Sequence, residues 1–95
     1  MHILLANKAP IPVFAYGGTE RVVWDLGKTL VQLGHQVTYL VPAGSSCDFA
    51  QVIAIDPGKG WYQQIPTDVD IAHFQFDPEF TADTQPDCPY VVTEH

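Results

Sequence analysis

The chain has 95 residues, 46% of them hydrophobic, which is enough for one modest core and at most one domain. Proteins bind nucleic acids largely by neutralising phosphate charges with lysine and arginine side chains. Because this chain has a formal net charge of −7, we expect no nucleic-acid binding. No apolar run approaches the roughly 20 residues that span a bilayer, and the first five residues lack the basic start of a signal peptide, so a cytoplasmic protein is expected.

The first predicted element is a strand at residues 3–6, a short apolar run typical of a central strand covered on both faces of a parallel sheet. A loop follows over residues 7–18 and contains Pro10 and Pro12. It is longer than the few residues usual between a strand and a helix. Long loops at this position are more often functional than accidental.

A helix and a second strand come next. Gly17, Gly18 and Thr19 suit a loop that enters a helix, and Gly34 supplies the left-handed residue that ends one. After Gly34, residues 36–41 are rich in β-branched and aromatic side chains and stop at Pro42, which predicts a strand. The apolar face of the predicted helix carries Val22, Val23, Leu26, Leu30 and Leu33. Its polar face carries Glu20, Arg21, Asp25, Lys28 and Gln32.

The remaining sequence alternates strands with weak connections. Residues 61–66 fit a short helix and irregular chain equally well, and residues 75–89 are expected to hold at most one helical turn, near 77–80. Cys47 and Cys88 fall in separate predicted loops without metal-ligand spacing, so we expect reduced, unpaired thiols and no metal site, with a disulfide as the alternative. Three further strands are predicted, at residues 51–55, 70–74 and 90–93.

Five strands with one clear helix predict an α/β fold with a Rossmann-like parallel sheet and right-handed connections. The chain finishes on an apolar strand without the helix that would cover it. We therefore expect residues 1–95 to be an incomplete domain, the front of a longer protein, with self-association possible through the last strand.

The glycine pair is the main candidate for chemistry. In an open parallel sheet, ligands bind beyond the carboxyl ends of the strands, and the loop after the first strand lies there. Gly17 and Gly18 have no Cβ, so their amides can approach an anion such as a diphosphate at the start of the helix, and Arg21 can add a charged donor. A glycine pair alone is explained equally well as a flexible entry to the helix.

The motif GGTER, an apolar helix and then LGHQVTYLVP resembles the amino-terminal domain of the GT-B retaining glycosyltransferases (glycosyltransferase family 4-like). The similarity covers the first 42 residues, and a second agreement lies at 91–95, where the family carries Thr-x-His in a strand. The residues between these two stretches share with the family only the succession of predicted strands.

The resemblance implies roles for particular residues. Gly17 and Gly18 would lie near the diphosphate of a nucleotide diphosphate sugar, the loop before them would shape the acceptor side, and His95 would face the donor sugar as the catalytic residue. It also implies transfer with retention, without metal or cofactor, and with most donor contacts made by a second, carboxyl-terminal domain. That domain's glutamate pair and basic residues have no counterpart here, so the fragment alone is expected to be inactive.

Several residues and functions remain as alternatives. His35 is better explained by packing after the helix end than by catalysis, and we favour a satisfied core histidine for His73 over a site residue. A dinucleotide-binding oxidoreductase would need a G-x-G-x-x-G turn straight after the first strand, which is missing. A non-catalytic binding or interaction module is the other alternative.

Overall fold

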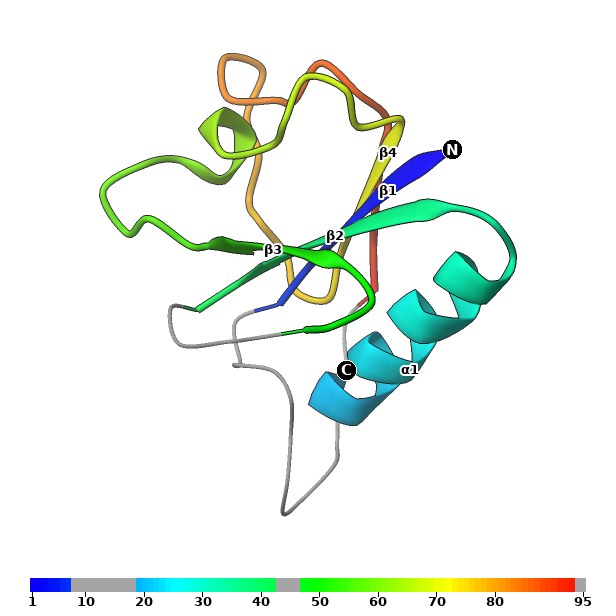
Figure 1. The fold of residues 1–95 in the computed structure, drawn as a ribbon. Helices are drawn as coiled ribbons and strands as arrows, with labels where there is room; N and C mark the ends of the chain where they lie inside the picture. Colours follow the sequence, from blue (N-terminus) through cyan, green and yellow to red (C-terminus); the bar gives the residue numbers. More distant parts are fainter. Residues whose placement is uncertain (8–18, 43–46, 94–95) are drawn as a thin grey trace.

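Five parallel strands form the centre of the molecule in the computed structural model (Figure 1). The structure describes residues 1–7, 19–42 and 47–93, and at 19–22 it describes only the backbone. The strand order is β3-β2-β1-β4-β5, and all four neighbouring pairs are parallel. The predicted α/β fold with a Rossmann-like parallel sheet is therefore confirmed. The strands are β1 (His2–Ala6), β2 (Gln36–Val41), β3 (Gln51–Ala54), β4 (Ile71–Phe74) and β5 (Tyr90–Val92).

Helix α1 (Thr19–Gln32) ends as the sequence predicts. Gly34 has a φ of 93°, its N–H donates to the carbonyl of Val31, and the N–H of His35 donates to the carbonyl of Leu30, both at 3.0 Å. These two bonds form a Schellman motif, which satisfies carbonyls that the helix end leaves open. The prediction that Leu33 lies on the buried face was wrong, because the chain leaves the helix before it and its side chain is 69% exposed.

The face of the sheet next to α1 holds the first half of the core. Val23 is fully buried there, as predicted, and Leu26 and Leu30 pack against the same cluster. Tyr39 of β2 is also fully buried, and its hydroxyl donates to the carbonyls of Val23 and Trp24 at 3.1 and 3.0 Å. These bonds join the helix to the sheet, and burial raises the pKa of Tyr39 above its ordinary value.

The opposite face is covered by a 3-10 turn and a long connection instead of a second α-helix (Figure 1). The turn is η1 (Trp61–Gln63), and Trp61 packs on Phe76 with ring centroids 4.8 Å apart. Phe74 of β4 is fully buried in this half of the core and meets Phe80 edge to face. Residues 77–80 form no helical turn, and the positive φ of 56° at Glu79 is incompatible with one.

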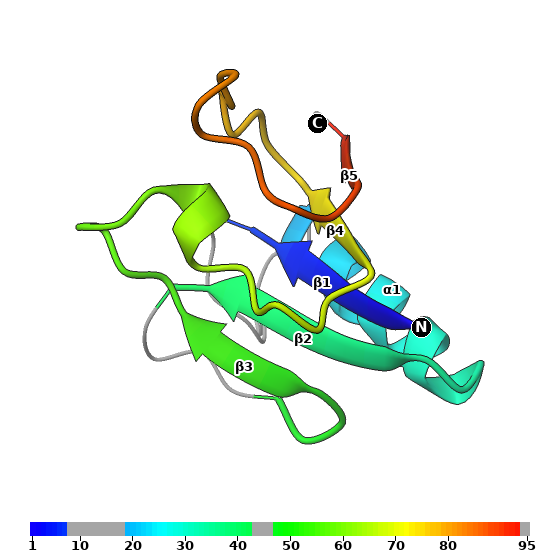
Figure 2. The ribbon, with the colours of Figure 1, turned by 90° about the horizontal axis from the view of Figure 1, so that it is seen from above.

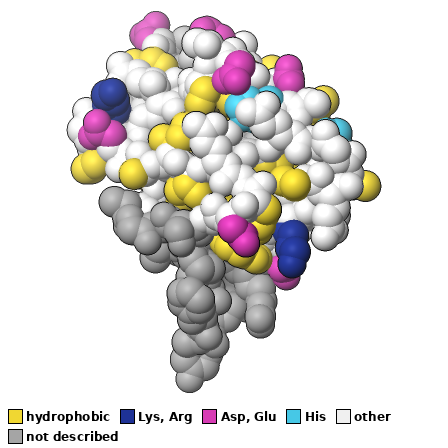
Figure 3. Space-filling view, in the orientation of Figure 1, with side chains coloured by type: hydrophobic (Ala, Val, Ile, Leu, Met, Phe, Trp, Pro, Cys, Tyr) yellow, Lys and Arg dark blue, Asp and Glu magenta, His cyan; other side chains and the backbone are white. Residues whose placement is uncertain are grey.

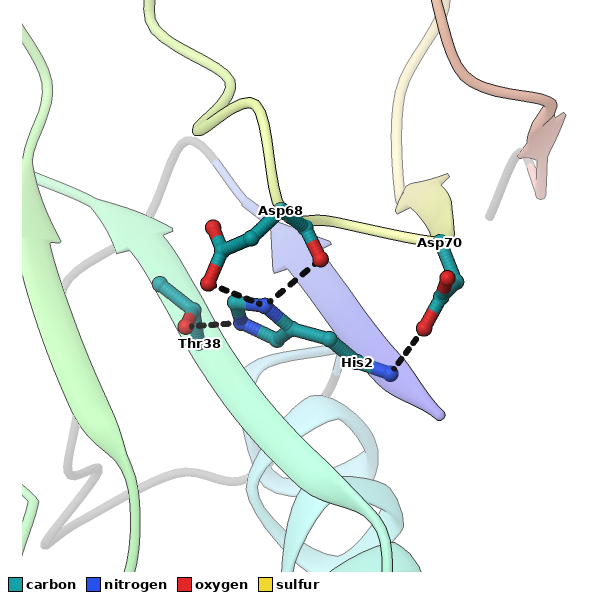
Figure 4. Close-up of polar contacts among 4 residues, drawn as sticks. All are labelled: His2, Thr38, Asp68 and Asp70. Atoms are coloured by element: carbon teal, nitrogen blue, oxygen red, sulfur yellow. Dashed lines mark hydrogen bonds and ion pairs between the residues drawn. The ribbon is translucent and has the colours of Figure 1, made fainter.

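The amino-terminal edge of the sheet is held by a buried histidine that the sequence analysis overlooked (Figure 4). The Nε2 atom of His2 lies 2.7 Å from the hydroxyl of Thr38 on β2, and Nδ1 lies 3.3 Å from both the carbonyl and a carboxylate oxygen of Asp68. Both Asp68 atoms are acceptors, so Nδ1 is the donor there, and Nε2 shares a hydrogen bond with the Thr38 hydroxyl. The backbone N–H of His2 also donates to Asp70 at 2.6 Å. One side chain thus ties β1 to β2 and to the turn before β4.

Candidate functional site

The order of the strands defines where a ligand is expected to bind. The chain crosses from β1 to β2 through α1 on one side of the sheet, and from β3 to β4 through η1 on the other (Figures 1 and 2). The strand order therefore reverses between β1 and β4, and a parallel sheet of this kind binds ligands beyond the carboxyl ends of its strands at such a reversal. Helix α1 begins at that same end of the sheet.

Three polar residues lie side by side at this edge, directly after β1, β4 and β5. The N–H of Asn7 donates to the carbonyl of Leu40 at 3.1 Å, the N–H of Gln75 to that of Ala6 at 3.1 Å, and the N–H of Thr93 to that of Phe74 at 2.9 Å. These bonds continue the pattern of the sheet by one residue beyond each strand. The backbone positions of Asn7, Gln75 and Thr93 are thus fixed relative to one another.

Asn7 has the most informative side chain of the three. It is only 5% exposed, and its amide nitrogen Nδ2 has no hydrogen-bond partner among the residues that the structure describes. Gln75 next to it is 6% exposed. A buried amide donor without a partner costs free energy, and most buried polar groups in folded proteins are paired. The carboxyl edge therefore offers a donor that a ligand oxygen would satisfy.

A histidine and a threonine extend the polar edge. His73 of β4 lies between Leu5 of β1 and Val91 of β5 in the sheet, and its Nε2 is 2.8 Å from the hydroxyl of Thr93. The histidine is hydrogen-bonded, as expected, but it is half-exposed and is not part of the core.

These side chains share the face of the sheet on which α1 lies. Leu5 belongs to the core beneath α1, and successive side chains along a strand point to opposite faces. Asn7, two residues after Leu5, follows on the same face, and so does His73, which pairs with Leu5 across the sheet. Asn7, His73, Gln75 and Thr93 thus form one group, which we name the carboxyl-edge group.

The site residues predicted from the sequence lie outside the described residues. This holds for Gly17, Gly18 and His95, and for the side chain of Arg21. Only their neighbours in the chain are placed: Asn7 and α1 bracket the loop that contains the glycines, and Thr93 precedes His95 by two positions. The segment with the glycine pair therefore joins the carboxyl end of β1 to the start of α1.

The described part of the surface carries little positive charge. Lys28 and Lys59 are the basic residues whose side chains are described, both are exposed, and the basic groups on the face in Figure 3 stand apart from one another. No group of three or more histidine, cysteine or acidic side chains within 1–7, 23–42 and 47–93 is placed to hold a metal ion. No helix in the described ranges has the length and apolar character needed to cross a membrane.

A hollow of about 310 Å³ lies at the other end of the sheet, before β4 and β5. Asp70, Asp87 and Cys88 contribute to its lining, and partial burial raises the pKa of the Cys88 thiol, which favours its uncharged form. Cys47 and Cys88 are both free thiols. Because the hollow opens at the amino ends of the strands and presents carboxylates, it is a poor match for the anion expected from the sequence.

Neither Asn7 nor Thr93 was predicted as a site residue, although Asn7 opens the loop expected to shape the acceptor side and Thr93 belongs to the Thr-x-His motif. A signal was present, because a polar residue directly follows an apolar strand in each case. Residues at the carboxyl ends of neighbouring parallel strands converge on one edge, but which strands are neighbours emerges only from the fold.

Comparison of the chain with protein-family models gives no match, and comparisons with curated proteins and with solved structures give no significant match either.

Proposed function

We propose that this chain is the amino-terminal, acceptor-side domain of a GT-B glycosyltransferase that moves a sugar from a nucleotide diphosphate sugar to an acceptor with retention. The observation that supports this most strongly is the strand order β3-β2-β1-β4-β5, with its reversal beside β1. The loop that carries Gly17 and Gly18 leaves β1 at that reversal and leads into α1. The backbone amides of a glycine pair at this position are suited to bind a diphosphate.

The chemistry explains what such a domain contributes. When a nucleoside diphosphate departs from the sugar, negative charge develops on it and must be stabilised by positioned cations or dipoles. The amides of Gly17 and Gly18, the amino end of α1 and the guanidinium of Arg21 are the donors this chain offers. They make up one side of a diphosphate site, so we propose that a second domain supplies the rest and that residues 1–95 alone do not catalyse transfer.

The decisive experiment is calorimetric titration of a nucleoside diphosphate sugar into the complete protein and its Gly18→Val variant. A Cβ branch at residue 18 would keep the ligand away from the backbone amides, so we expect at least about tenfold weaker binding. Gly58→Val is the matched control, since Gly58 lies in the exposed turn after the edge strand β3. Equal affinity in the wild type and Gly18→Val would contradict the proposal.

The runner-up is a non-catalytic interaction module, which one observation favours. Tyr90, Val91 and Val92 of β5 are 39%, 49% and 38% exposed, and β5 is an edge strand (Figure 2). An apolar edge strand is able to pair with another chain. Stable complex formation together with silence in both glycosyl-transfer and hydride-transfer assays of the complete protein would favour this function.

A dinucleotide-binding oxidoreductase ranks below both. Its nucleotide-binding domain shares this type of strand order, so topology does not separate the two enzyme classes. The long loop with Pro10 and Pro12 replaces the tight glycine turn such a domain needs.

A further inference from the structure

We propose that the carboxyl-edge group binds a hydroxyl group of an uncharged sugar or polyol, with Asn7 as the principal donor. The identification of this molecule as the acceptor substrate rests on the proposed function, whereas its binding by Asn7 does not. The inference starts from the Nδ2 atom of Asn7, which is buried and has no partner within the described residues.

The burial of Asn7 argues for a ligand. Position 7 directly follows four apolar residues of β1 whose side chains are at most 9% exposed, and a leucine there would extend that core without an unpaired donor. The asparagine leaves an N–H without an acceptor among the described residues, in a place where such a donor costs stability. A ligand oxygen placed beyond β1 would remove this cost. Such a donor is therefore better explained by binding than by folding.

The chemistry of the neighbours indicates a hydroxyl group. Asn7, Gln75 and Thr93 are all neutral, and their amide and hydroxyl groups each combine donor and acceptor atoms. A sugar hydroxyl likewise donates and accepts, so it can be satisfied by such neutral groups. His73 already engages the hydroxyl of Thr93 at 2.8 Å, which orients it.

Charge argues against an anion at this group. Neither Lys28 nor Lys59, the two basic residues with described side chains, belongs to it. Among the described side chains, the group therefore presents neutral donors without a cation, which favours an uncharged ligand.

The position also fits a molecule that receives a sugar. Asn7 is the last described residue before the loop that contains the glycine pair, and Thr93 lies two positions before His95. An acceptor hydroxyl must reach the anomeric carbon next to the donor's diphosphate. A hydroxyl-binding group that borders both segments is well placed for that approach.

The test is an NMR titration of the ¹⁵N-labelled complete protein with myo-inositol, D-glucose and inorganic phosphate, each added separately. The reporter is the side-chain amide signal of Asn7, which is assigned by its loss in Asn7→Leu. We expect myo-inositol or D-glucose to shift this signal saturably and phosphate to leave it unchanged. The proposal is overturned if neither polyol shifts it, or if phosphate shifts it and the polyols do not.

Stability separates a ligand-binding role from a structural one. Asn7→Leu replaces a buried amide, whose Nδ2 has no partner among the described residues, with an apolar side chain of similar size, so we expect a higher urea midpoint and about tenfold weaker polyol binding. Gln36→Leu likewise replaces a neutral amide with leucine, but at an exposed site at the amino end of β2, and is expected to leave polyol binding unchanged. A lower midpoint with unchanged polyol affinity in Asn7→Leu would overturn the proposal. If Asn7→Leu does not fold, the titration of the wild type decides.

A transfer assay distinguishes this inference from the proposed function. Transfer activity whose KM for the acceptor is unchanged in Asn7→Leu would refute the hydroxyl site and leave the glycosyltransferase proposal standing. Polyol binding at Asn7 without any transfer activity would support the hydroxyl site and contradict the glycosyltransferase proposal.

Discussion

The contact between Gly27 and Tyr39 allows a test of how closely α1 packs on the sheet. Gly27 is buried in the middle of α1, and a Cβ built on it would lie 1.9 Å from the hydroxyl oxygen and 2.6 Å from Cζ of Tyr39. The tyrosine ring has little room to move, because its hydroxyl bonds to Val23 and Trp24 and its ring packs on Trp24 and Phe49. Gly27→Ala must therefore displace either the ring or the helix.

The magnitude follows from three effects of different sign. Alanine is a better helix former than glycine by about 1 kcal/mol. Forcing a methyl group into a packed core costs about 1–3 kcal/mol, and moving the Tyr39 hydroxyl away from its two carbonyls costs about 1–3 kcal/mol more. The packing and hydrogen-bond costs exceed the helix gain, so we expect Gly27→Ala to lower the free energy of unfolding by about 3 kcal/mol.

Urea unfolding followed by tryptophan fluorescence and circular dichroism measures this change. Thr29→Ala is the matched control, because it also introduces a better helix former into α1 but at an exposed position. The double variant Gly27→Ala/Tyr39→Phe removes the closest contacting atom, so its loss should be smaller than the sum of the single losses by about 1 kcal/mol. A Gly27→Ala protein as stable as Thr29→Ala would refute the close packing of α1 on β2.

Two further predictions concern buried polar groups. Thr38→Val should lower the free energy of unfolding by about 1–3 kcal/mol, because it leaves the buried Nε2 of His2 without its hydrogen-bond partner, and His2→Leu/Thr38→Val should recover much of that loss. Urea unfolding measures both changes, and equal stability of Thr38→Val and the wild type would contradict the role of the hydrogen bond. Stability should also fall as the pH rises above the ordinary pKa of tyrosine, since the folded state keeps Tyr39 protonated through burial while the unfolded chain releases the proton. Tyr39→Phe should flatten this decline when unfolding is measured between pH 9 and 11, and an identical slope in both proteins would show that another group is responsible.

The sequence by itself determined the elements. The apolar run in β1, the β-branched residues of β2, β3 and β5 and the glycine that ends α1 are local signals, and the predicted strands agree with the observed ones to within one residue at each end. Such signals suffice because hydrogen bonding and side-chain alternation within an element depend on near neighbours in the chain. Leu33 was misassigned because its spacing fits the helix period, whereas α1 ends at Gln32 and the Schellman motif turns the chain at Gly34, directly after Leu33.

Only the tertiary structure decided which strand lies beside which. No local signal shows that β4 pairs with β1 and not with β3, because this choice depends on burying both faces of the sheet at once. That choice brings Asn7, Gln75 and Thr93 to one edge from three distant parts of the sequence. It also encloses His2 between Thr38 and Asp68. The candidate site was therefore hidden in the sequence, since its members are neighbours only across the sheet.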